Sequence, residues 1–220
     1  MLEVVTGICS NVHEIKEDLQ ATFILINTIC DKLGIKYATS GTHPFAKYVD
    51  RKVFPSKRYY ELIDRNQWIA QRLCVFGLHV HLGMKSKDDC INFMNMFQWF
   101  LPLFAAFSTS SPFWQGKKTG LHSSRLTIFE ASPTSGHCYS LNNWTEFEQR
   151  IILLQKCGTI NSIKDLWWDI KPSPHYGTLE IRICDGIATF HELLGILALI
   201  HSIAHFYERY KFYQAYEKKT

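Results

Sequence analysis

Residues 178–185, Thr-Leu-Glu-Ile-Arg-Ile-Cys-Asp, are the stretch of the chain that decides the fold. Every second side chain from Leu179 to Ile183 is apolar, which is the pattern of a β-strand with one buried face. Glu180 and Arg182 alternate with these residues and therefore share the opposite face. We predict a half-buried strand whose polar face carries a carboxylate and a guanidinium side by side.

A second strand-like stretch lies at residues 74–83, Cys-Val-Phe-Gly-Leu-His-Val-His-Leu-Gly, and its polar face carries His79 and His81. If the polar faces of both stretches lie on one side of a sheet, an acid, two imidazoles and an arginine surround one site. That combination suits a metal ion and a phosphate group. Taken alone, a Glu/Arg pair on a strand is usually a solvated charge pair, and a His-x-His pattern is more often hydrogen-bonded than metal-bound.

The composition is that of a globular domain. Of the 220 residues, 46% are hydrophobic and 20% charged, enough for one domain with a sizeable core. The net charge of +4 comes without a long basic run, which favours phosphate-bearing small molecules over nucleic acid as partners. Seven scattered cysteines without a Cys-x-x-Cys pattern indicate reduced thiols. With no signal peptide and no apolar run long enough for a span, we predict a cytoplasmic, soluble protein without a membrane partner.

The periodicity of the remaining chain predicts an α+β fold. Capping residues and apolar spacing predict helices that begin near residues 11, 57, 86, 143 and 189. The helix that follows Ser86 is expected to kink or break at Pro102. Further strands are predicted at residues 1–6, 35–39 and 165–170, which gives about five strands, mostly antiparallel, with helices on one face.

Residues 108–140 show no periodicity and are rich in Gly, Ser and turn residues, which predicts binding loops. Residues 115–119, Gln-Gly-Lys-Lys-Thr, lack the upstream glycine of a P-loop, so this nucleotide motif is excluded. No linker or internal repeat is present, and the sequence predicts a single domain over residues 1–220.

Several segments together resemble the glutamate–cysteine ligase type 2 family of carboxylate–amine ligases. They follow the family's order along the chain and comprise residues 1–9, 41–45, 75–83, 111–116 and 166–174, the last running into 179–182. The resemblance implies a glutamine-synthetase-like fold, in which a curved, mostly antiparallel sheet holds ATP and metal ions on its concave face and helices on its convex face.

The resemblance also implies a reaction and a set of site residues. ATP phosphorylates a carboxylate, and an amine then attacks the acyl phosphate to form a gamma-glutamyl-type amide bond. The implied cofactors are ATP and Mg²⁺ or Mn²⁺, and the partners are the amino-acid substrates. Residues at matching positions are expected to bind metal (Glu3, His79, Glu180), to bind phosphate and act in catalysis (Arg182), to bind the substrate carboxylate (Arg125) and to line the site (His43, His81).

Family members begin with a Glu-x-Glu strand upstream of the position of Met1, and they continue past the last helix. The resemblance therefore predicts a catalytic domain that is truncated at both ends. A sheet without its first strand exposes an unpaired edge, which invites a second copy or another chain to cover it.

Two other hypotheses stay open at this stage. A truncated family member can be catalytically silent and act as a nucleotide-binding, metal-binding or assembly module. A metal hydrolase that uses His79 and His81 is a third hypothesis, although it leaves Arg182 unexplained. The sequence does not identify which acid and which amine are joined.

Overall fold

The computed structural model describes the backbone of residues 2–217 and the side chains of residues 2–211. Helices and small, mainly antiparallel sheets make up the chain, which confirms the α+β class. Its contacts divide it into two compact units, each described separately below. Unit 1 is Met1–Thr39 with Ala188–Thr220, and unit 2 is Ser40–Ile187. That both units belong to a single domain stays a prediction.

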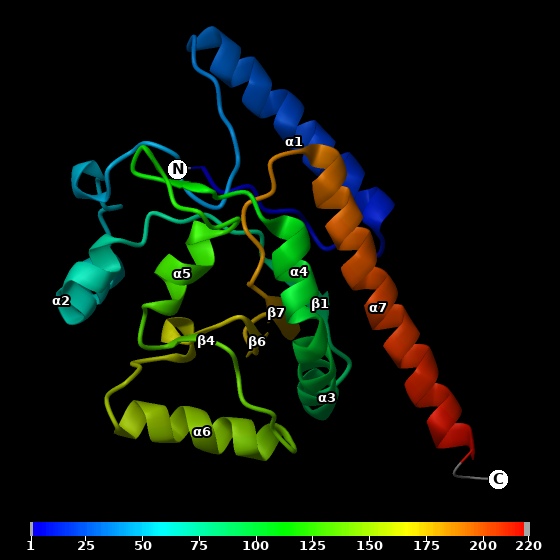
Figure 1. Cartoon of the computed structure of the whole chain (residues 1–220). Coiled ribbons are helices and arrows are strands. Elements are labelled where there is room, and N and C mark those ends of the chain that lie inside the picture. Colours follow the sequence, from blue (N-terminus) through cyan, green and yellow to red (C-terminus); the bar gives the residue numbers. More distant parts are fainter. Residues whose placement is uncertain (1, 218–220) are drawn as a thin grey trace. The chain divides into compact units, whose positions relative to one another are not determined.

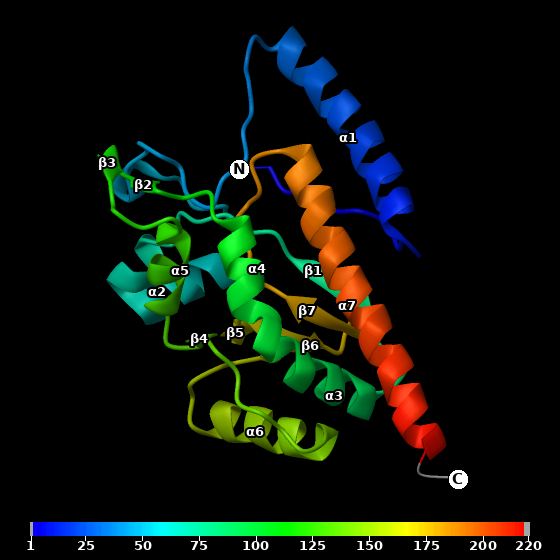
Figure 2. The same ribbon diagram turned by 45° about the vertical axis from the view of Figure 1, so that its right-hand side comes forward.

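The main sheet of unit 2 has three antiparallel strands in the order β1-β7-β6, which lie side by side in Figure 1 and Figure 2. Both strands that decide the fold are present, but each is shorter than predicted. The strands are β1 (Val80–Gly83), β6 (Ile170–Ser173) and β7 (Thr178–Ile181). Upstream of β1, Val75 and Gly77 pair with the rest of unit 2 only through isolated bridges, because the ladder ends at Val80.

One face of this sheet is apolar and the other polar, as the alternation predicted, but the prediction that β7 is only half-buried is wrong, because Glu180 and Lys171 on the polar face are buried as well. On one face Ile170, Leu179 and Ile181 are fully buried, and helix α3 (Lys87–Phe97) contacts strands β6 and β7. Burial of such side chains supplies most of the stability of a sheet of this size. The other face is polar and carries Glu180, which makes it the candidate site.

The helix predicted after Ser86 breaks where proline was expected to end it. Helix α3 passes into the 3-10 helix η2 (Gln98–Phe100), and α4 (Leu101–Ser108) then begins with Pro102 in its first turn, where a missing N–H costs nothing. Ile91, Met94 and Phe97 of α3 and Phe104 of α4 are fully buried and form the core of unit 2.

The segment predicted as irregular, residues 108–140, contains more structure than expected. It holds a short hairpin, a short strand that pairs in parallel with another segment, and a buried helix. Each of these elements is too short to show a periodic pattern in the sequence. The remaining elements of unit 2 are η1 (Tyr48–Asp50), α2 (Lys57–Gln71), β2 (Phe113–Trp114), β3 (Lys117–Lys118), α5 (Ser124–Glu130), β4 (Ser135–Gly136), α6 (Trp144–Lys156), η3 (Ile163–Asp165) and β5 (Trp167–Trp168).

Unit 1 contains α1 (Val12–Lys32) and α7 (Phe190–Glu217), which contact each other. The capping box before α1 is confirmed, because the Asn11 side chain accepts from the Glu14 amide at 3.0 Å. The strands predicted at 1–6 and 35–39 are wrong for the described residues. The composition of these stretches is typical of β-strands, but no neighbouring strand among the described residues pairs with them. Met1 lies outside the described residues.

Two helical segments are long and apolar enough to cross a membrane, contrary to the expectation from the sequence: Lys87–Ser108 and Phe190–Lys211. The first contributes several fully buried side chains to the core of unit 2, and core helices pass the same test. Length and composition in one or two helices are weak evidence for a span, so the absence of a membrane partner stays a prediction.

Candidate functional site

The buried Glu180 carboxylate is the centre of a polar cluster on the polar face of the sheet. Its side chain is 8% exposed, and four basic side chains surround it. Oε1 lies 3.6 Å from His79 Nδ1 and 3.9 Å from His81 Nε2, and it accepts a hydrogen bond from Arg182 Nη1. Oε2 lies 3.7 Å from Lys171 Nζ. The structure thus brings together an acid, two imidazoles and two cations, which we call the Glu180 cluster.

Strand register explains this convergence. His81 pairs with Glu180 across β1 and β7, and Lys171 pairs with Glu180 across β6 and β7. The three residues form one row across the sheet, and directly paired side chains lie within contact range. Arg182 follows Glu180 by two residues and reaches it from the same face.

Burial and neighbouring charges set the charge state of the cluster. Burial, followed by the charges of Arg182 and Arg125, lowers the pKa of His79 to about 2, so its imidazole is neutral at pH 7 with a free lone pair. Burial likewise lowers the pKa of Lys171 to about 8, and Glu180 opposes this shift. Two cations therefore oppose one carboxylate, and the cluster has a surplus of positive charge that suits an anion.

Arg182 is incompletely satisfied in this arrangement. Its Nη1 pairs with Glu180, whereas its Nε is buried without a hydrogen-bond partner among the described residues. A buried donor left unpaired costs free energy, which a ligand oxygen would recover. The guanidinium thus has one donor that no described residue uses.

The donors for a metal ion are present only in part. The neutral His79 imidazole and the Glu180 carboxylate are both metal-ligand types. Within residues 2–211, however, no group of three or more His, Cys, Asp and Glu side chains is arranged to hold a metal ion. Glu180 now pairs with Lys171 and Arg182, so it could ligate a metal only if these cations turned to another anion. These two residues fit part of a metal site.

The Glu180 cluster, which is defined within unit 2, includes neither Glu3 nor His43. Glu3 belongs to unit 1, where it is exposed, and its part in metal binding stays a prediction. His43 belongs to unit 2, and its Nδ1 accepts a hydrogen bond from the Ala46 amide at 3.0 Å. That bond, with an edge contact to the Phe45 ring at 4.6 Å, gives His43 a role in shaping its own loop.

Arg125 is buried beneath the site rather than displayed in it. It is 2% exposed, and its guanidinium donates to the carbonyl of Arg182 at 2.9 Å and to that of Ile183 at 3.0 Å. Gly77 leaves the space for it, since a Cβ at Gly77 would lie 2.4 Å from Arg125 Nη2. Arg125 supports the backbone that carries Arg182, and its predicted contact with a substrate carboxylate stays a prediction.

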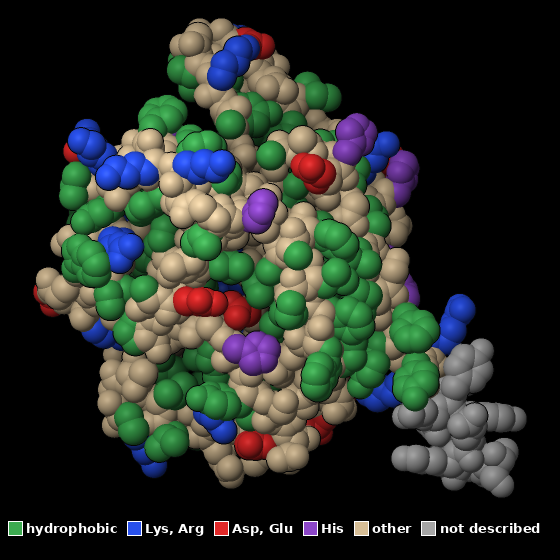
Figure 3. Space-filling model, viewed as in Figure 1, with side chains coloured by type: hydrophobic (Ala, Val, Ile, Leu, Met, Phe, Trp, Pro, Cys, Tyr) green, Lys and Arg blue, Asp and Glu red, His purple; other side chains and the backbone are tan. Residues whose placement is uncertain are grey.

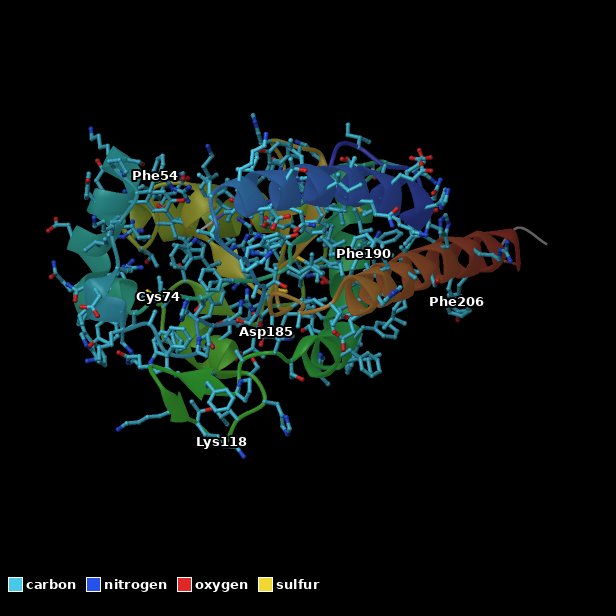
Figure 4. The ribbon with its side chains drawn as sticks, turned by 90° about the horizontal axis from the view of Figure 1, so that it is seen from above. Phe54, Cys74, Lys118, Asp185, Phe190 and Phe206 are labelled. Atoms are coloured by element: carbon cyan, nitrogen blue, oxygen red, sulfur yellow. The ribbon has the colours of Figure 1, made fainter. Side chains whose placement is uncertain are left out.

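Asp185, which was not predicted as a site residue, organises the loops near the end of β7. The residue is 1% exposed, and it accepts hydrogen bonds from the Ser110 amide at 3.1 Å, Ser111 Oγ at 2.6 Å and Ser123 Oγ at 2.9 Å. Figure 4 places Asp185 inside unit 2, whereas Lys118 lies at the outer end of the β2–β3 hairpin. The serine-rich composition of residues 108–124 was the available signal, but serine alone does not reveal its partner.

Lys171 was also missed, although its strand position carried a signal. The sequence Ile-Lys-Pro-Ser at 170–173 alternates apolar and polar residues like the strand that contains Glu180. The prolines and the glycine in and after this segment are typical of a turn. The position of Lys171 opposite Glu180 was therefore not predicted.

A second polar group surrounds Asp169, which follows β5. Burial and the charge of Glu130 raise the pKa of the Asp169 carboxyl, while His137 and Arg125 oppose the shift. Figure 3 shows acidic and histidine side chains gathered near the middle of one face of the molecule. Asp169 is 6% exposed, and its backbone carbonyl accepts from the Arg182 amide at 2.7 Å, which couples it to the strand of the Glu180 cluster.

Comparison with known proteins identifies what this chain is similar to. The model of Glutamate-cysteine ligase family 2 matches residues 1–219. A Bdellovibrio bacteriovorus protein named "Putative glutamate--cysteine ligase 2" is 51% identical over 204 residues, which cover 93% of this chain and 54% of that protein. Proteins with the same name from Thermobifida fusca and Gloeobacter violaceus are 46% and 38% identical, each over 94% of this chain and over 52% and 56% of their own length. The chain spans about half the length of the curated relatives it matches.

Proposed function

The chain belongs to the glutamate–cysteine ligase 2 family, a carboxylate–amine ligase type, and we propose that it carries the core of an ATP-dependent ligase site. The reaction proposed is formation of a gamma-glutamyl-type amide. A carboxylate oxygen attacks the terminal phosphorus of ATP and releases ADP, and the amine then displaces phosphate from the acyl phosphate. The observation that supports it is the Glu180 cluster, where two cations, a neutral imidazole and a carboxylate lie together on the polar face of the sheet.

The side chains of this cluster suit the needs of phosphoryl transfer, which are mainly positioning and charge neutralisation. Arg182 offers an unpaired Nε to a phosphate oxygen. Lys171, although outside the set predicted from sequence, adds a second cation beside the same carboxylate. Mg²⁺ or Mn²⁺, when bound, would neutralise phosphate charge, and Glu180, His79 and Glu3 are the residues proposed to hold it.

The fold and setting proposed with this function follow the family. The three-stranded sheet with helix α3 on its apolar face is proposed to be part of a glutamine-synthetase-like curved sheet. We place the protein in the cytoplasm with ATP, an amino-acid carboxylate and an amine as small-molecule partners. A second copy or another chain covering the open sheet edge is part of the same proposal.

A nucleotide-binding module without turnover is the second candidate. It is favoured by the incomplete donor set around Glu180 in the described residues and by the fraction of the relatives' length that the chain covers. Such a module would bind ATP at the Glu180 cluster and release no ADP.

One assay separates these functions. The chain is incubated with ATP, Mg²⁺, glutamate and cysteine, and ADP release is followed with each amino acid left out in turn. We expect ADP release only when the amino acids are present, and we expect the Glu180→Gln variant to abolish it. Glu148→Gln, which changes an exposed glutamate of α6, is the control and should keep the activity. ADP release that ignores the amino acids, or that survives in Glu180→Gln, would refute the ligase proposal.

A further inference from the structure

Unit 2 contains a pocket that shares no residue with the Glu180 cluster. The pocket has a volume of about 480 Å³ and lies between helix α6 and the segment around β4 and β5. Small-molecule sites typically have volumes of about 300–1,000 Å³, so this pocket has room for a small metabolite. Its polar side chains include Arg150, Glu146 and His137, and its apolar wall includes Leu166 and Trp168.

Arg150 is the feature of this pocket that needs a ligand. Its guanidinium carbon lies 4.6 Å from the centroid of the Tyr139 ring, so the guanidinium stacks on that ring. Its Nε is buried and has no hydrogen-bond partner among the described residues. A guanidinium that stacks on a ring by its flat face can still donate hydrogen bonds in its plane, and two such donors match the two oxygens of a carboxylate.

The one carboxylate in the pocket wall is committed elsewhere. Glu146 Oε2 accepts from the Asn142 amide at 2.8 Å and from the Asn142 side chain at 2.9 Å, as part of the cap of α6. The hydrogen bond from the Asn142 backbone amide is the main cause of the lowered pKa of the Glu146 carboxyl. The charge of Arg150 is a smaller cause of the same shift, so Glu146 also attracts Arg150, but its hydrogen bonds go to Asn142 and no ion pair joins it to Arg150 among the described residues. Arg150 can therefore bind a second anion.

The other residues of the pocket wall favour a ligand whose anionic group is attached to an apolar part. Leu166 and Trp168 are 1% and 6% exposed and form the floor, whereas Leu153 and Tyr139 at the rim are 59% and 64% exposed. Exposed apolar side chains around a hollow mark a place where burial of a ligand would be favourable. The contacts needed are one anionic end and one hydrocarbon or aromatic end.

We propose that this pocket binds a small monocarboxylate with an apolar body, with the carboxylate on Arg150 and the body against Leu153, Leu166 and Trp168. It is a binding site additional to the Glu180 cluster. The proposal does not depend on ligase activity, because no residue of the Glu180 cluster lines the pocket.

Calorimetric titration of the full chain with hydrocinnamate tests the site. We expect saturable binding of one hydrocinnamate per chain, and we expect hydrocinnamyl alcohol, which has the same body without the charge, to bind at least tenfold more weakly. Arg150→Met removes the charge-assisted hydrogen bonds and should weaken hydrocinnamate binding by about tenfold or more. Lys156→Met, on the same helix but outside the pocket, removes the same charge and should bind as the wild type does.

Two further variants keep the test decisive. Arg150→Lys retains the charge without the two-point geometry and should bind with an affinity between those of the wild type and Arg150→Met; it also covers the case in which Arg150→Met fails to fold. Glu180→Gln should bind hydrocinnamate normally, which separates this pocket from the proposed ligase site. Absence of saturable binding, equal affinity for the alcohol, or equal affinity in Arg150→Lys and Lys156→Met would overturn the proposal.

Discussion

At the scale of single residues, the site depends on charges that are buried and held by one another. Glu180 is surrounded by four basic side chains, and Arg125 lies beneath them with its guanidinium on two backbone carbonyls. Buried charged groups stay ionised only when their partners are fixed. Residues that support the Glu180 cluster, such as Arg125, therefore matter for stability as much as the residues of the cluster itself matter for binding.

Replacing Arg125 should destabilise unit 2 strongly. Arg125→Met leaves the carbonyls of Arg182 and Ile183 without their donor, and we expect a loss of about 2–4 kcal/mol in the free energy of unfolding. Urea unfolding measures it, with Lys118→Met at the exposed hairpin as the control, which should change stability by less than about 0.5 kcal/mol. A loss no larger than that of the control would contradict this structural role of Arg125.

Asp169 predicts a pH dependence. Because burial raises the pKa of its carboxyl in the folded state, the folded chain binds this proton more tightly than the unfolded chain does. The contribution of Asp169 to stability is therefore lost as pH rises above the carboxyl's ordinary range near 3.8, and the cost is fully present at pH 7.

Asp169→Asn should consequently raise the urea midpoint at pH 7 relative to wild type, and this gain should shrink as the pH approaches 4. The exposed Asp64→Asn is the matched control and should give the same small difference at both pH values. A gain for Asp169→Asn that is larger at pH 4 than at pH 7 would contradict the assignment.

At the scale of elements, strand register and close backbone approach determine where the site residues lie. The row His81, Glu180, Lys171 exists because β1, β7 and β6 pair in one register. Beyond the end of β7, Asp185 accepts hydrogen bonds from serines of the 108–124 segment, and Gly41 leaves the space for this contact. A Cβ at Gly41 would lie 2.5 Å from Asp185 Cγ and 2.8 Å from Ser111 Oγ.

Gly41→Ala should therefore displace Asp185 and destabilise unit 2 by about 1–3 kcal/mol, the usual cost of overpacking. Gly195→Ala is a matched control with the opposite sign. It lies in helix α7 with nothing within 4 Å of its Cβ position, and it should stabilise the chain by about 0.5–1 kcal/mol. Thermal unfolding of both variants tests this pair, and a harmless Gly41→Ala would mean that the loops tolerate movement of Asp185.

At the scale of the whole molecule, secondary structure could be predicted from the sequence wherever one periodic pattern extended over a whole helix or strand. The amphipathic helices α1 and α6 and the break at Pro102 are as predicted, and the two strands that carry Glu180 and His81 are present but shorter than predicted. Their periods and caps are local properties of the chain. The convergence of Glu180 with His79 and Arg182 followed from alternation on those strands.

Features that depend on distant partners were not predictable in this way. Residues 2–6 have a strand composition, yet no neighbouring strand pairs with them in the described chain. Helix α5 is only one or two turns long, and Lys171 and Asp185 gain their importance from partners that tertiary structure brings to them. Composition and spacing do not record such partners.

Calorimetric titration of ATP into the chain, with and without Mg²⁺, tests the central claim that the Glu180 cluster is a metal–nucleotide site. The account predicts Mg²⁺-dependent ATP binding that weakens by about tenfold or more in Glu180→Gln and in Lys171→Met, with Glu148→Gln unchanged. ATP affinity that is the same in wild type, Glu180→Gln and Lys171→Met, or absence of ATP binding by the wild-type chain, would contradict it.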